Sequence, residues 1–379
     1  MNFDLSDDDT ALQDSVSRWV QQRYPFDARR KLAATDTGFS PAHWQEMAQM
    51  GWLALPFAEA HGGLGGGPLS IALLMEELGK GLVLEPILPT LLLFGGALKR
   101  SPALADAWLP KLIEGKLQGA LAIGERDSRY ELADQQCTLR RTGAGYELSG
   151  EKVLVLNGTA ADQLVVVARS SGGRFDTQGL TLALVDATAP GVTRTPLRLM
   201  DGQSVAHIRF DHVAVPAYQL LCAEGSGHAL LHDVVQDATL ALCAEAFGVM
   251  QLLYATTLDY VKTRKQFGVT IGSFQVLQHR LVDMFTALEQ TRSLLYRAVC
   301  SAQDSGAARS EIERNVVALK AMVGKCGRLI GGEAIQMHGG MGITDELLVG
   351  HGMKRLMVIN SSFGDADWHR QRFAEMSHA

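Results

Sequence analysis

The spacing of hydrophobic positions along the 379-residue chain changes twice, which predicts helical, then β, then helical structure. From residue 1 to about 117 the spacing is helical, beginning with this set: Leu12, Val16, Trp19 and Val20. We expect Ser6, which precedes acidic residues, to cap the first helix, and another helix to open near Pro41. A glycine-rich segment, His61–Pro68, then breaks the pattern before Ser70–Leu78 resumes it. Because no strand precedes this segment and no Lys-Ser/Thr pair follows it, a flexible turn is favoured over a phosphate cradle.

Between about 118 and 226 the period falls to two, and β-branched and aromatic residues gather in short runs. The strands are predicted over these runs: Tyr146–Leu148, Lys152–Leu156, Gln163–Ala168, Leu180–Val185 and His207–Val213. Hairpin turns are expected at these sites: Gly143–Gly145, Asn157–Gly158, Ser171–Gly173 and Pro190–Gly191. The segment therefore predicts a small β domain.

From residue 227 onward the sequence contains no proline, and long amphipathic stretches return. They cover Leu230–Lys262, Phe274–Ser305 and Ser310–Met337. Uninterrupted stretches of this length suit a bundle of antiparallel helices, because an internal proline would break a helix. On the second stretch, we expect one apolar stripe to face the bundle core: Leu277, Leu281, Met284, Leu288 and Leu295.

Composition narrows the class of protein. Hydrophobic residues make up 47% and charged residues 20%, which excludes a disordered chain. Lys and Arg number 35 against 41 Asp and Glu, so this weakly acidic chain is not expected to bind nucleic acid. Five cysteines without a Cys-x-x-Cys pair are expected to be reduced core residues. We recognise no targeting segment and no membrane span of ~20 apolar residues, so the prediction is a cytoplasmic protein.

Two segments contain residue patterns that indicate a binding site and not only packing. The first, Tyr260–Gln278, contains Arg264 and is read as a helix end, a tight glycine turn and a new helix that Ser273 caps. The second, Glu333–Glu346, contains Gln336 and runs from a helix into another glycine turn. Each places an arginine or a glutamine beside exposed backbone N–H groups. That combination suits a dinucleotide pyrophosphate, because guanidinium is a planar charged donor and glycine lets the backbone approach a phosphate.

These motifs resemble those of the acyl-CoA dehydrogenase family, and the similarity extends over the whole chain. The matching segments are Arg264-x-Gln-Phe-Gly followed by Phe-Gln-x-x-Gln, and Gln336-x-x-Gly-Gly-x-Gly. The resemblance implies an α+β, mostly α fold: an N-terminal helical domain over 1–117, a middle β-barrel over 118–226 and a C-terminal four-helix bundle over 227–379. It also implies FAD as the cofactor, with its adenosine and pyrophosphate half bound mainly by the neighbouring subunit.

The resemblance assigns cofactor contacts to residues of both segments. Arg264 would face the pyrophosphate, Phe267 would pack on the cofactor and Gln275 would make a polar contact. The adenine side would be lined by the second segment: Gln336, Met337, His338, Gly339 and Gly340.

The base of the family reaction is missing from its usual positions. That reaction removes a proton α to a thioester carbonyl and passes the β-hydride to flavin, so it needs a carboxylate base and donors that polarise the thioester. At the two family positions for the base this chain has Phe363 and Ala238, neither of which accepts a proton. Asp237 is adjacent, but one residue along a helix is rotated by about 100°, so its carboxylate is expected to point away from that pocket.

Other family positions differ as well. In the flavin-facing signature of the β domain, over 124–131, only Glu125 keeps its place. In a second signature, Leu154–Gly158, leucines replace a tryptophan and a threonine, and the substrate-helix Asp-x-x-Arg pair reads Gln236-x-x-Thr239. Asp365 replaces a threonine near the cofactor, where a carboxylate would repel a pyrophosphate, unless it is a solvated surface acid.

The pattern leads to a hypothesis about assembly. Groups that would serve this subunit's own flavin and substrate are missing, while groups offered to a neighbour's FAD remain. We therefore expect a partner subunit of a heteromeric, α2β2 acyl-CoA dehydrogenase that acts on an acyl-CoA and delivers electrons to an electron-transfer flavoprotein. The ending of the chain, from His338 to Asp367, resembles small subunits of heteromeric members that act on pimeloyl-CoA or steroid-CoA thioesters, which implies fatty acid or steroid side-chain catabolism.

Two alternatives stay open. One is a non-catalytic scaffold or acyl-CoA-binding homologue, and the other is a self-sufficient homotetramer whose base is Asp237 or Glu245. A metal site is not expected, because the histidines lack metal-ligand spacing and are expected at the surface or at an interface. These histidines are His228, His232, His338, His351 and His369.

Overall fold

The structure is a computed structural model that describes residues 5–143 and 145–378. By compactness the chain divides into two units, which we name the helical unit and the sheet unit. The helical unit comprises Met1–Lys31, Gly67–Val83 and Thr239–Ala379, and the sheet unit comprises Leu32–Gly66 and Leu84–Ala238. Each unit is assembled from segments distant in sequence. The division into three consecutive domains stays a prediction.

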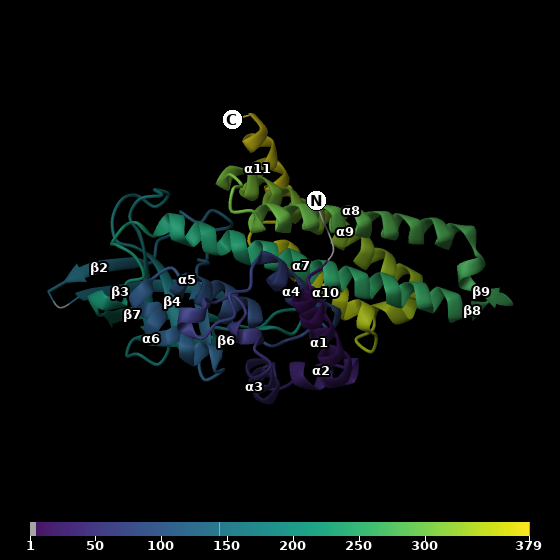
Figure 1. The fold of residues 1–379 in the computed structure, drawn as a ribbon, viewed down its shortest axis with the longest axis horizontal. Coiled ribbons are helices and arrows are strands. Elements are labelled where there is room, and N and C mark those ends of the chain that lie inside the picture. Colours follow the sequence, from purple (N-terminus) through teal and green to yellow (C-terminus); the bar gives the residue numbers. More distant parts are fainter. Residues whose placement is uncertain (1–4, 144, 379) are drawn as a thin grey trace. The chain divides into compact units, whose positions relative to one another are not determined.

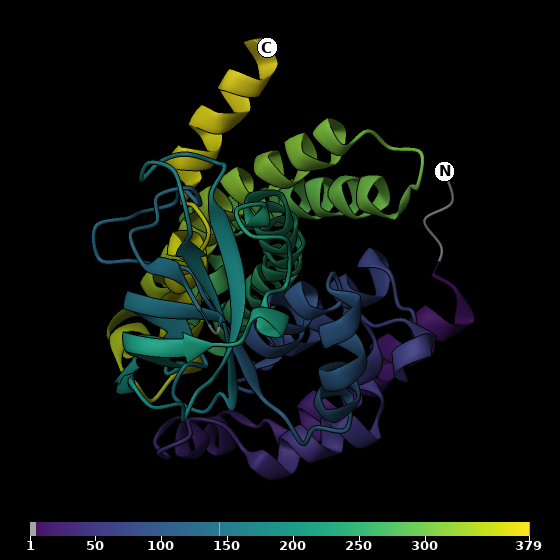
Figure 2. The ribbon, with the colours of Figure 1, turned by 90° about the vertical axis from the view of Figure 1, so that its left-hand side faces the viewer.

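The sheet unit is built on a seven-stranded sheet (Figure 2). Its strands are β1 (Gly119–Ala122), β2 (Thr138–Thr142), β3 (Gly145–Leu156), β4 (Gln163–Arg169), β5 (Leu180–Asp186), β6 (Val192–Arg198) and β7 (Ser204–Val215). Hydrogen bonding gives the order β1-β4-β2-β3-β7-β6, with β5 paired to β4. The pairs that β4 makes with β1 and β2 are parallel, and the other pairs are antiparallel.

Burial follows the position of each strand in the sheet. Every residue of β4, which has neighbours on both sides, is buried, whereas the edge strand β6 is mostly exposed. β6 also contains Pro196, which an edge strand tolerates because its N–H side can face solvent. The apolar interior of the sheet is formed chiefly by inward residues of β3, β4 and β7, such as Leu148, Val166 and Ile208.

The predicted turns are confirmed at two of the four sites. Gly143–Gly145, of which residue 144 lies outside the described residues, joins the antiparallel strands β2 and β3, and Ser171–Gly173 lies between β4 and β5. Asn157–Gly158 and Pro190–Gly191 are not hairpin turns, because β3 pairs with β2 and β7, and β5 pairs with β4. The Asn157 side-chain amide instead donates to Thr90 Oγ1 at 3.2 Å. This bond connects the end of β3 to the π-helical segment Leu88–Gly95.

Strand lengths also differ from the prediction. The two runs around residue 150 form one continuous strand, β3, with register shifts that accommodate the break in the pattern. The strands β1, β2 and β6 were not predicted, because they are short or rich in charged and polar residues. Helices of the sheet unit are α3 (Pro41–Gln49), a π-helical turn (Leu88–Gly95) that continues as α5 (Gly96–Leu98), and α6 (Pro102–Ile113).

The helical unit contains the long helices that the sequence predicts. Its elements are α1 (Asp7–Arg23), most of α2 (Phe26–Ala33), α4 (Pro68–Lys80), α7 (Gly227–Thr263, from Thr239 onward), α8 (Gln275–Gln303), α9 (Arg309–His338), α10 (Leu348–Ser361) and α11 (Ala366–His378). α9 packs against α8, α10 and α11 (Figure 1). Ser6 caps α1 by accepting the Asp9 N–H at 3.1 Å, as expected, and the His61–Pro68 segment is the expected loop before α4.

The core of the helical unit agrees with the predicted apolar stripe of α8. Four of its residues are buried and Leu277 is half-buried; the buried ones are Leu281, Met284, Leu288 and Leu295. Of the described helices, α7 is long and apolar enough to cross a membrane, yet 78% of its most apolar window is buried inside the protein. Such burial is typical of a core helix. The expected α+β, mostly helical fold is confirmed.

Candidate functional site

The two motif segments lie at the same end of the helical unit, where α7 and α9 end (Figure 1). The ring of Tyr260, near the end of α7, stacks on the ring of His338, the last residue of α9, with ring centroids 4.2 Å apart. An ion pair of 2.8 Å joins Arg280 on α8 to Glu333 on α9. The two segments therefore lie against each other at this end of the unit.

A short hairpin connects α7 to α8. Its strands are β8 (Lys265–Gln266) and β9 (Val269–Thr270), and its two central residues have positive φ, 54° at Phe267 and 82° at Gly268. Glycine adopts this conformation freely, whereas for phenylalanine it costs roughly 1–2 kcal/mol. The Phe267 side chain is 91% exposed. A strained backbone that presents a phenyl ring to solvent indicates a contact surface.

Arg264 and Gln275 flank this hairpin with exposed side chains. Within the described residues, the guanidinium of Arg264 has neither a hydrogen-bond nor an ion-pair partner. Ser273 does not cap α8 as predicted, because a 3-10 turn delays the helix by one residue and the cap is Phe274. The Ser273 hydroxyl instead donates to the Thr270 carbonyl at 2.7 Å. The first amides of α8 consequently have no side-chain cap, an arrangement that suits an anion.

The glycines after α9 leave the backbone open at this site. Gly339 has a φ of 60°, and a β-carbon on Gly339 or Gly340 would meet no atom within 4 Å. Gly342 is different, because a β-carbon there would lie 2.5 Å from the Ile335 carbonyl oxygen. Packing therefore accounts for Gly342, whereas Gly339 and Gly340 leave room for a ligand.

The remaining predicted contacts divide by exposure. The Gln336 side chain is exposed, whereas those of Met337 and His338 are buried. His338 also forms a 2.8 Å hydrogen bond between Nδ1 and the Ala334 carbonyl oxygen. The expectation that His338 lies at the surface is therefore wrong, and Met337 and His338 can offer a ligand little besides their backbone.

The exposed groups at this site fit the pyrophosphate and adenine parts of FAD. An unpaired guanidinium supplies charge-assisted donors for a pyrophosphate, and open glycines let backbone N–H groups approach it. The exposed ring of Phe267 supplies a flat apolar surface.

The loop between α10 and α11 carries one of the two family positions for the base. Phe363 occupies it with a φ of 55°, and its carbonyl oxygen lies 2.9 Å from His369 Nε2. The ammonium of Lys320, on α9, donates to the Asn360 carbonyl at 3.1 Å and to the Gly364 carbonyl at 2.5 Å. The loop is thus fixed by its carbonyl oxygens and places a phenyl ring where a carboxylate would act.

Sequence reasoning missed the roles of Lys320 and His369. Burial lowers the pKa of Lys320 to about 8 and the pKa of His369 to about 4. His369 is 4% exposed, so its expected surface position is wrong. A signal for Lys320 existed in the sequence, because Val316, Val317 and Val323 surround it at helical spacing and place it on a buried face.

The other candidate bases are either absent or already paired. Ala238 is fully buried, and the adjacent Asp237 forms an ion pair with Arg100 at 2.7 Å within the sheet unit. In the helical unit, Glu245 accepts two hydrogen bonds from Arg355, at 2.6 and 2.7 Å, and both side chains are buried. Each of these carboxylates therefore already neutralises an arginine.

Glu125, the residue that keeps its place in the β-domain signature, is buried. Its carboxylate accepts the backbone N–H groups of Gln136 and Cys137 at 2.7 and 2.9 Å, and it forms an ion pair with the buried Lys152 at 2.7 Å. These bonds anchor the 124–131 stretch to β3. Glu125 therefore has a structural role in this chain.

The remaining histidines and the cysteines have structural surroundings. Among the described residues, no group of three or more His, Cys, Asp or Glu side chains is placed to hold a metal ion. The half-buried His351 lies 3.1 Å from an Arg29 guanidinium nitrogen, and the rings of His228 and His232 are 6.5 Å apart. All five cysteines are free thiols, and three of them are buried.

Comparison with known proteins covers the whole chain. Three family models match: Acyl-CoA dehydrogenase, N-terminal domain over residues 6–116, middle domain over 120–213 and C-terminal domain over 225–377. The L-prolyl-[peptidyl-carrier protein] dehydrogenase of Serratia sp. is 30% identical over 367 residues, which is 93% of this chain and 92% of that protein. The mitochondrial isovaleryl-CoA dehydrogenase of Arabidopsis thaliana is 30% identical over 76% of this chain and 73% of that protein.

Solved structures agree with this assignment. The FAD complex of PigA has a TM-score of 0.91 at 28% identity and covers 100% of this chain and 99% of its own. A variant of the Tcur3481-Tcur3483 steroid ACAD has a TM-score of 0.87 at 27% identity, with 98% of both chains covered.

Proposed function

Because the chain belongs to the acyl-CoA dehydrogenase family, we propose that it is the base-lacking subunit of a heteromeric, FAD-dependent acyl-CoA dehydrogenase. The family places it among oxidoreductases that use FAD. The partner role is our proposal: this chain supplies cofactor contacts to a paralogous subunit in an α2β2 assembly, and the paralogue supplies the base. The substrate is an acyl-CoA, and an electron-transfer flavoprotein accepts the electrons. A cytoplasmic location stays a prediction.

The observation that carries the proposal is that the Arg264 side chain is exposed and unpaired among the described residues. Within that part of the chain this guanidinium has no hydrogen-bond or ion-pair partner, so its donors are available to a ligand. It lies at the base of a strained hairpin that exposes Phe267, and the glycines after α9 are open at the same end of the helical unit. This arrangement supports a surface that receives a phosphate-bearing ligand held in part by another chain.

The missing base supports the same proposal. Phe363 and Ala238 occupy the two family positions, and both candidate substitutes, Asp237 and Glu245, are held by arginines. A carboxylate that an arginine already holds would have to leave that partner before it could reach a substrate proton. These pairs disfavour the self-sufficient enzyme.

One relative points in the same direction. The Tcur3481-Tcur3483 steroid ACAD is named for two components, and its chain is 27% identical to this one over 98% of the length. The complex of ChsE4 and ChsE5 from Mycobacterium tuberculosis, at 24% identity, shares the fold.

In the assembly, this chain binds and orients rather than reacts. FAD, when bound, supplies the acceptor for the β-hydride of the substrate. The guanidinium of Arg264 would hold the pyrophosphate, and backbone N–H groups at Gly339 and Gly340 would face the same ligand. The paralogous subunit would supply the carboxylate that takes the α-proton, and loss of that proton and of the β-hydride would give the α,β-double bond.

The test is the visible flavin spectrum of the purified chain, alone and with its paralogue. We expect a colourless lone chain and a yellow complex with one FAD per pair of chains. In the complex, Arg264→Ala removes a charge-assisted hydrogen bond worth roughly 1.5–3 kcal/mol, which is a roughly ten- to hundredfold loss of FAD affinity. Arg264→Lys should recover part of this loss, because the charge remains while the planar fork is gone.

A matched control is Arg297→Ala, since Arg297 is an exposed arginine of α8 outside both motif segments. It should leave FAD occupancy unchanged. Stoichiometric FAD in the lone chain, bleached by an acyl-CoA, would contradict the partner role and establish a self-sufficient enzyme. If the complex with Arg264→Ala holds as much FAD as the unchanged complex, the result would support the scaffold alternative.

A further inference from the structure

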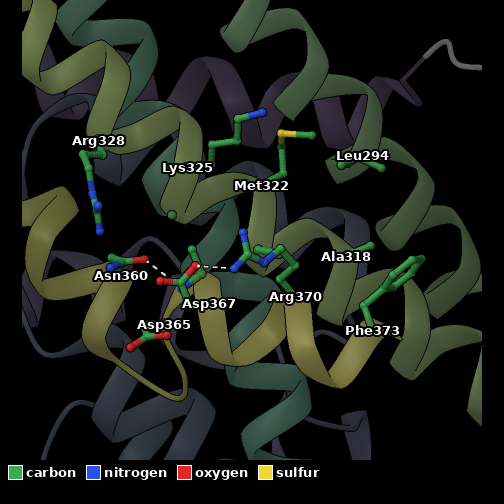
Figure 3. Close-up of a pocket in the computed structure, with 13 residues that line it drawn as sticks. Leu294, Ala318, Met322, Lys325, Arg328, Asn360, Asp365, Asp367, Arg370 and Phe373 are labelled. Atoms are coloured by element: carbon green, nitrogen blue, oxygen red, sulfur yellow. Dashed lines mark hydrogen bonds and ion pairs between the residues drawn. The ribbon is translucent and has the colours of Figure 1, made fainter. Parts of the chain in front are cut away.

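Helix α10 connects the two loops of the candidate site. It begins after the glycine turn that follows α9 and ends at the loop that carries Phe363. Beside its last turn lies a cavity of about 460 Å³, whose lining includes Asn360 of α10 and Asp365 of that loop (Figure 3). The buried Arg355 holds the middle of α10 against α7 through Glu245. Because the rest of α10 is anchored in this way, contacts at its first turn bear on the glycine turn.

His351, in the first turn of α10, bridges two other segments of the helical unit. Its Nδ1 lies 3.1 Å from a guanidinium nitrogen of Arg29 on α2, and its Nε2 lies 3.1 Å from the carbonyl oxygen of Asp345 in the loop before α10. The ring also makes an edge-to-face contact with Phe26 of α2, with ring centroids 5.0 Å apart. The His351 side chain thus joins an N-terminal helix to the loop that contains the glycine turn.

The two partners of His351 fix which ring nitrogen carries the proton. A guanidinium only donates hydrogen bonds, and a carbonyl oxygen only accepts them. Nδ1 therefore accepts from Arg29, and Nε2 carries the hydrogen that it donates to the Asp345 carbonyl oxygen. This arrangement requires the neutral imidazole, because both nitrogens of a protonated ring are donors.

Arg29 is held in place beside the ring. It is 2% exposed, and its Nε donates to the Leu82 carbonyl at 2.7 Å. A second proton on His351 would place two cations against each other at the 3.1 Å contact, where like charges repel. The protonated ring cannot keep this position, so its bond to the Asp345 carbonyl is lost with it.

Charged groups on three segments act on the pKa of this ring. Burial lowers the pKa of His351 below its ordinary 6.5, and the hydrogen bond with the Asp345 carbonyl raises it. The positive charges of Arg29 and Lys354 lower the pKa, and the Asp345 carboxylate raises it. The neutral ring, and with it the bridge, is therefore fully present above about pH 6.5 and is lost as the pH falls through the lowered pKa.

The bridge acts on the glycine turn over a short stretch of chain. Gly339–Ile343 form a 3-10 turn, and the N–H and the hydroxyl of Thr344 both donate to a carbonyl of this turn. Asp345 is the next residue, and its carboxylate, which is 73% exposed, pairs with Lys354. Because an exposed ion pair contributes little, the bond from the half-buried His351 is the stronger hold on this loop.

We propose that His351 is a positioning residue that holds Gly339 and Gly340 in the conformation that binds FAD, and that its protonation at acidic pH weakens FAD binding. The inference rests on the proposed function, because it requires that the glycine turn faces FAD. His351 itself contacts no cofactor and acts through the Asp345 carbonyl. The affinity of the complex for FAD then depends on the charge of one histidine.

Flavin titration of the complex between about pH 8 and about pH 5 tests this role. As the pH falls below about 6.5, we expect the unchanged complex to lose FAD affinity about two- to tenfold, because one hydrogen bond is lost. His351→Gln keeps one acceptor and one donor but does not titrate. Its affinity should match that of the unchanged complex at about pH 8 and stay constant. His351→Leu removes both bonds and should bind FAD about two- to tenfold more weakly at about pH 8.

A matched control removes a histidine elsewhere in the chain. The side chain of His212, on β7 in the sheet unit, is 72% exposed. His212→Gln should keep the pH dependence of the unchanged complex. Circular dichroism of each variant shows whether the helices are intact, and His351→Gln carries the test by itself if His351→Leu does not fold.

Hydrogen exchange in the chain alone separates this inference from the proposed function, because it needs no FAD. Amides of residues 341–347 should exchange faster in His351→Leu than in His351→Gln. At about pH 5 they should also exchange faster in the unchanged chain than in His351→Gln, a comparison in which the intrinsic effect of pH on exchange cancels. Faster exchange without any change in FAD affinity would overturn the positioning role.

Three results with FAD would also overturn the proposal. They are a parallel loss of affinity in the unchanged complex and in His351→Gln, a constant affinity of the unchanged complex down to about pH 5, and His351→Leu that binds FAD as tightly as the unchanged complex at about pH 8. If Arg264→Ala still lowers FAD affinity in the same assay, the proposed function stands and only the role of His351 has failed.

Discussion

Glu245→Gln separates a structural carboxylate from a catalytic one. Glu245 and Arg355 are 6% and 4% exposed and share two hydrogen bonds of 2.6 and 2.7 Å between α7 and α10. Glutamine keeps the size of the side chain but removes its charge, so the buried Arg355 cation loses the ion pair with Glu245. Removing one partner of a buried pair costs about 3–5 kcal/mol. For a unit of this size, each kcal/mol shifts the melting temperature by about 2–4 °C, so we expect a drop of about 6–20 °C.

The assay pairs thermal unfolding with turnover of the complex at a temperature far below the melting point. We expect the complex that contains Glu245→Gln to keep its kcat, because the buried pair does not supply the base. Arg355→Met alone should destabilise the protein similarly, while the double variant Glu245→Gln/Arg355→Met should lose less than the sum of the two, because the two side chains contact each other and their effects are not additive.

A surface pair provides the control. Glu289 and Arg292 on α8 lie 3.3 Å apart, with their side chains 38% and 37% exposed. Glu289→Gln should change the stability by less than about 1 kcal/mol, because exposed pairs contribute little. An unchanged melting temperature together with abolished turnover in Glu245→Gln would refute the reasoning and make Glu245 the base.

Two further predictions follow from the loop and the hairpin. Phe267→Gly should weaken FAD binding by the complex, which a flavin titration measures. The melting temperature of the complex should stay equal or rise, because glycine relieves the positive φ of 54°. A large loss of stability in a thermal melt would contradict this prediction. Burial lowers the pKa of His369 from 6.5 to about 4, so its contribution to stability is fully present above pH 6.5 and is lost as the pH falls through about 4. Unfolding by denaturant should therefore show that the free energy of unfolding falls by on the order of 3 kcal/mol across that pH window. His369→Gln, which keeps a donor for the Phe363 carbonyl, should make the free energy of unfolding depend less on pH there. An equally steep fall of stability at acidic pH in this variant would assign the pH dependence to another group.

The fold could be predicted from the sequence where the information is local. The periods of hydrophobic residues predict the long helices α7, α8 and α9 and the strands β4 and β5, because each element buries a face of regular spacing. Short strands escaped this reasoning. β8 and β9 contain two residues each, and their pairing depends on the positive φ of Phe267 and Gly268, which residue type alone does not predict.

The candidate site divides in the same way. Arg264 and Gln336 belong to segments in which a helix ends, so their exposure could be expected from the sequence. The structure places both residues at one end of the helical unit. The burial of Met337 and His338 could not be inferred, because it depends on the stacking of His338 on Tyr260 from another helix. Contacts between distant segments decide which side of a motif faces a ligand.

The pairing of the two candidate bases could not be predicted from the sequence for a related reason. The sequence shows that Phe363 and Ala238 cannot take a proton, but any other carboxylate could act in their place if it were unpaired and near the substrate. The two that were considered are paired with arginines at sequence separations of 137 for Asp237 and 110 for Glu245. No local sequence pattern reports such a pairing, because the partners are far apart in the sequence. The structure therefore shows that both considered carboxylates, Asp237 and Glu245, are held by arginines, a fact that the proposed partner role uses and that the sequence alone does not contain.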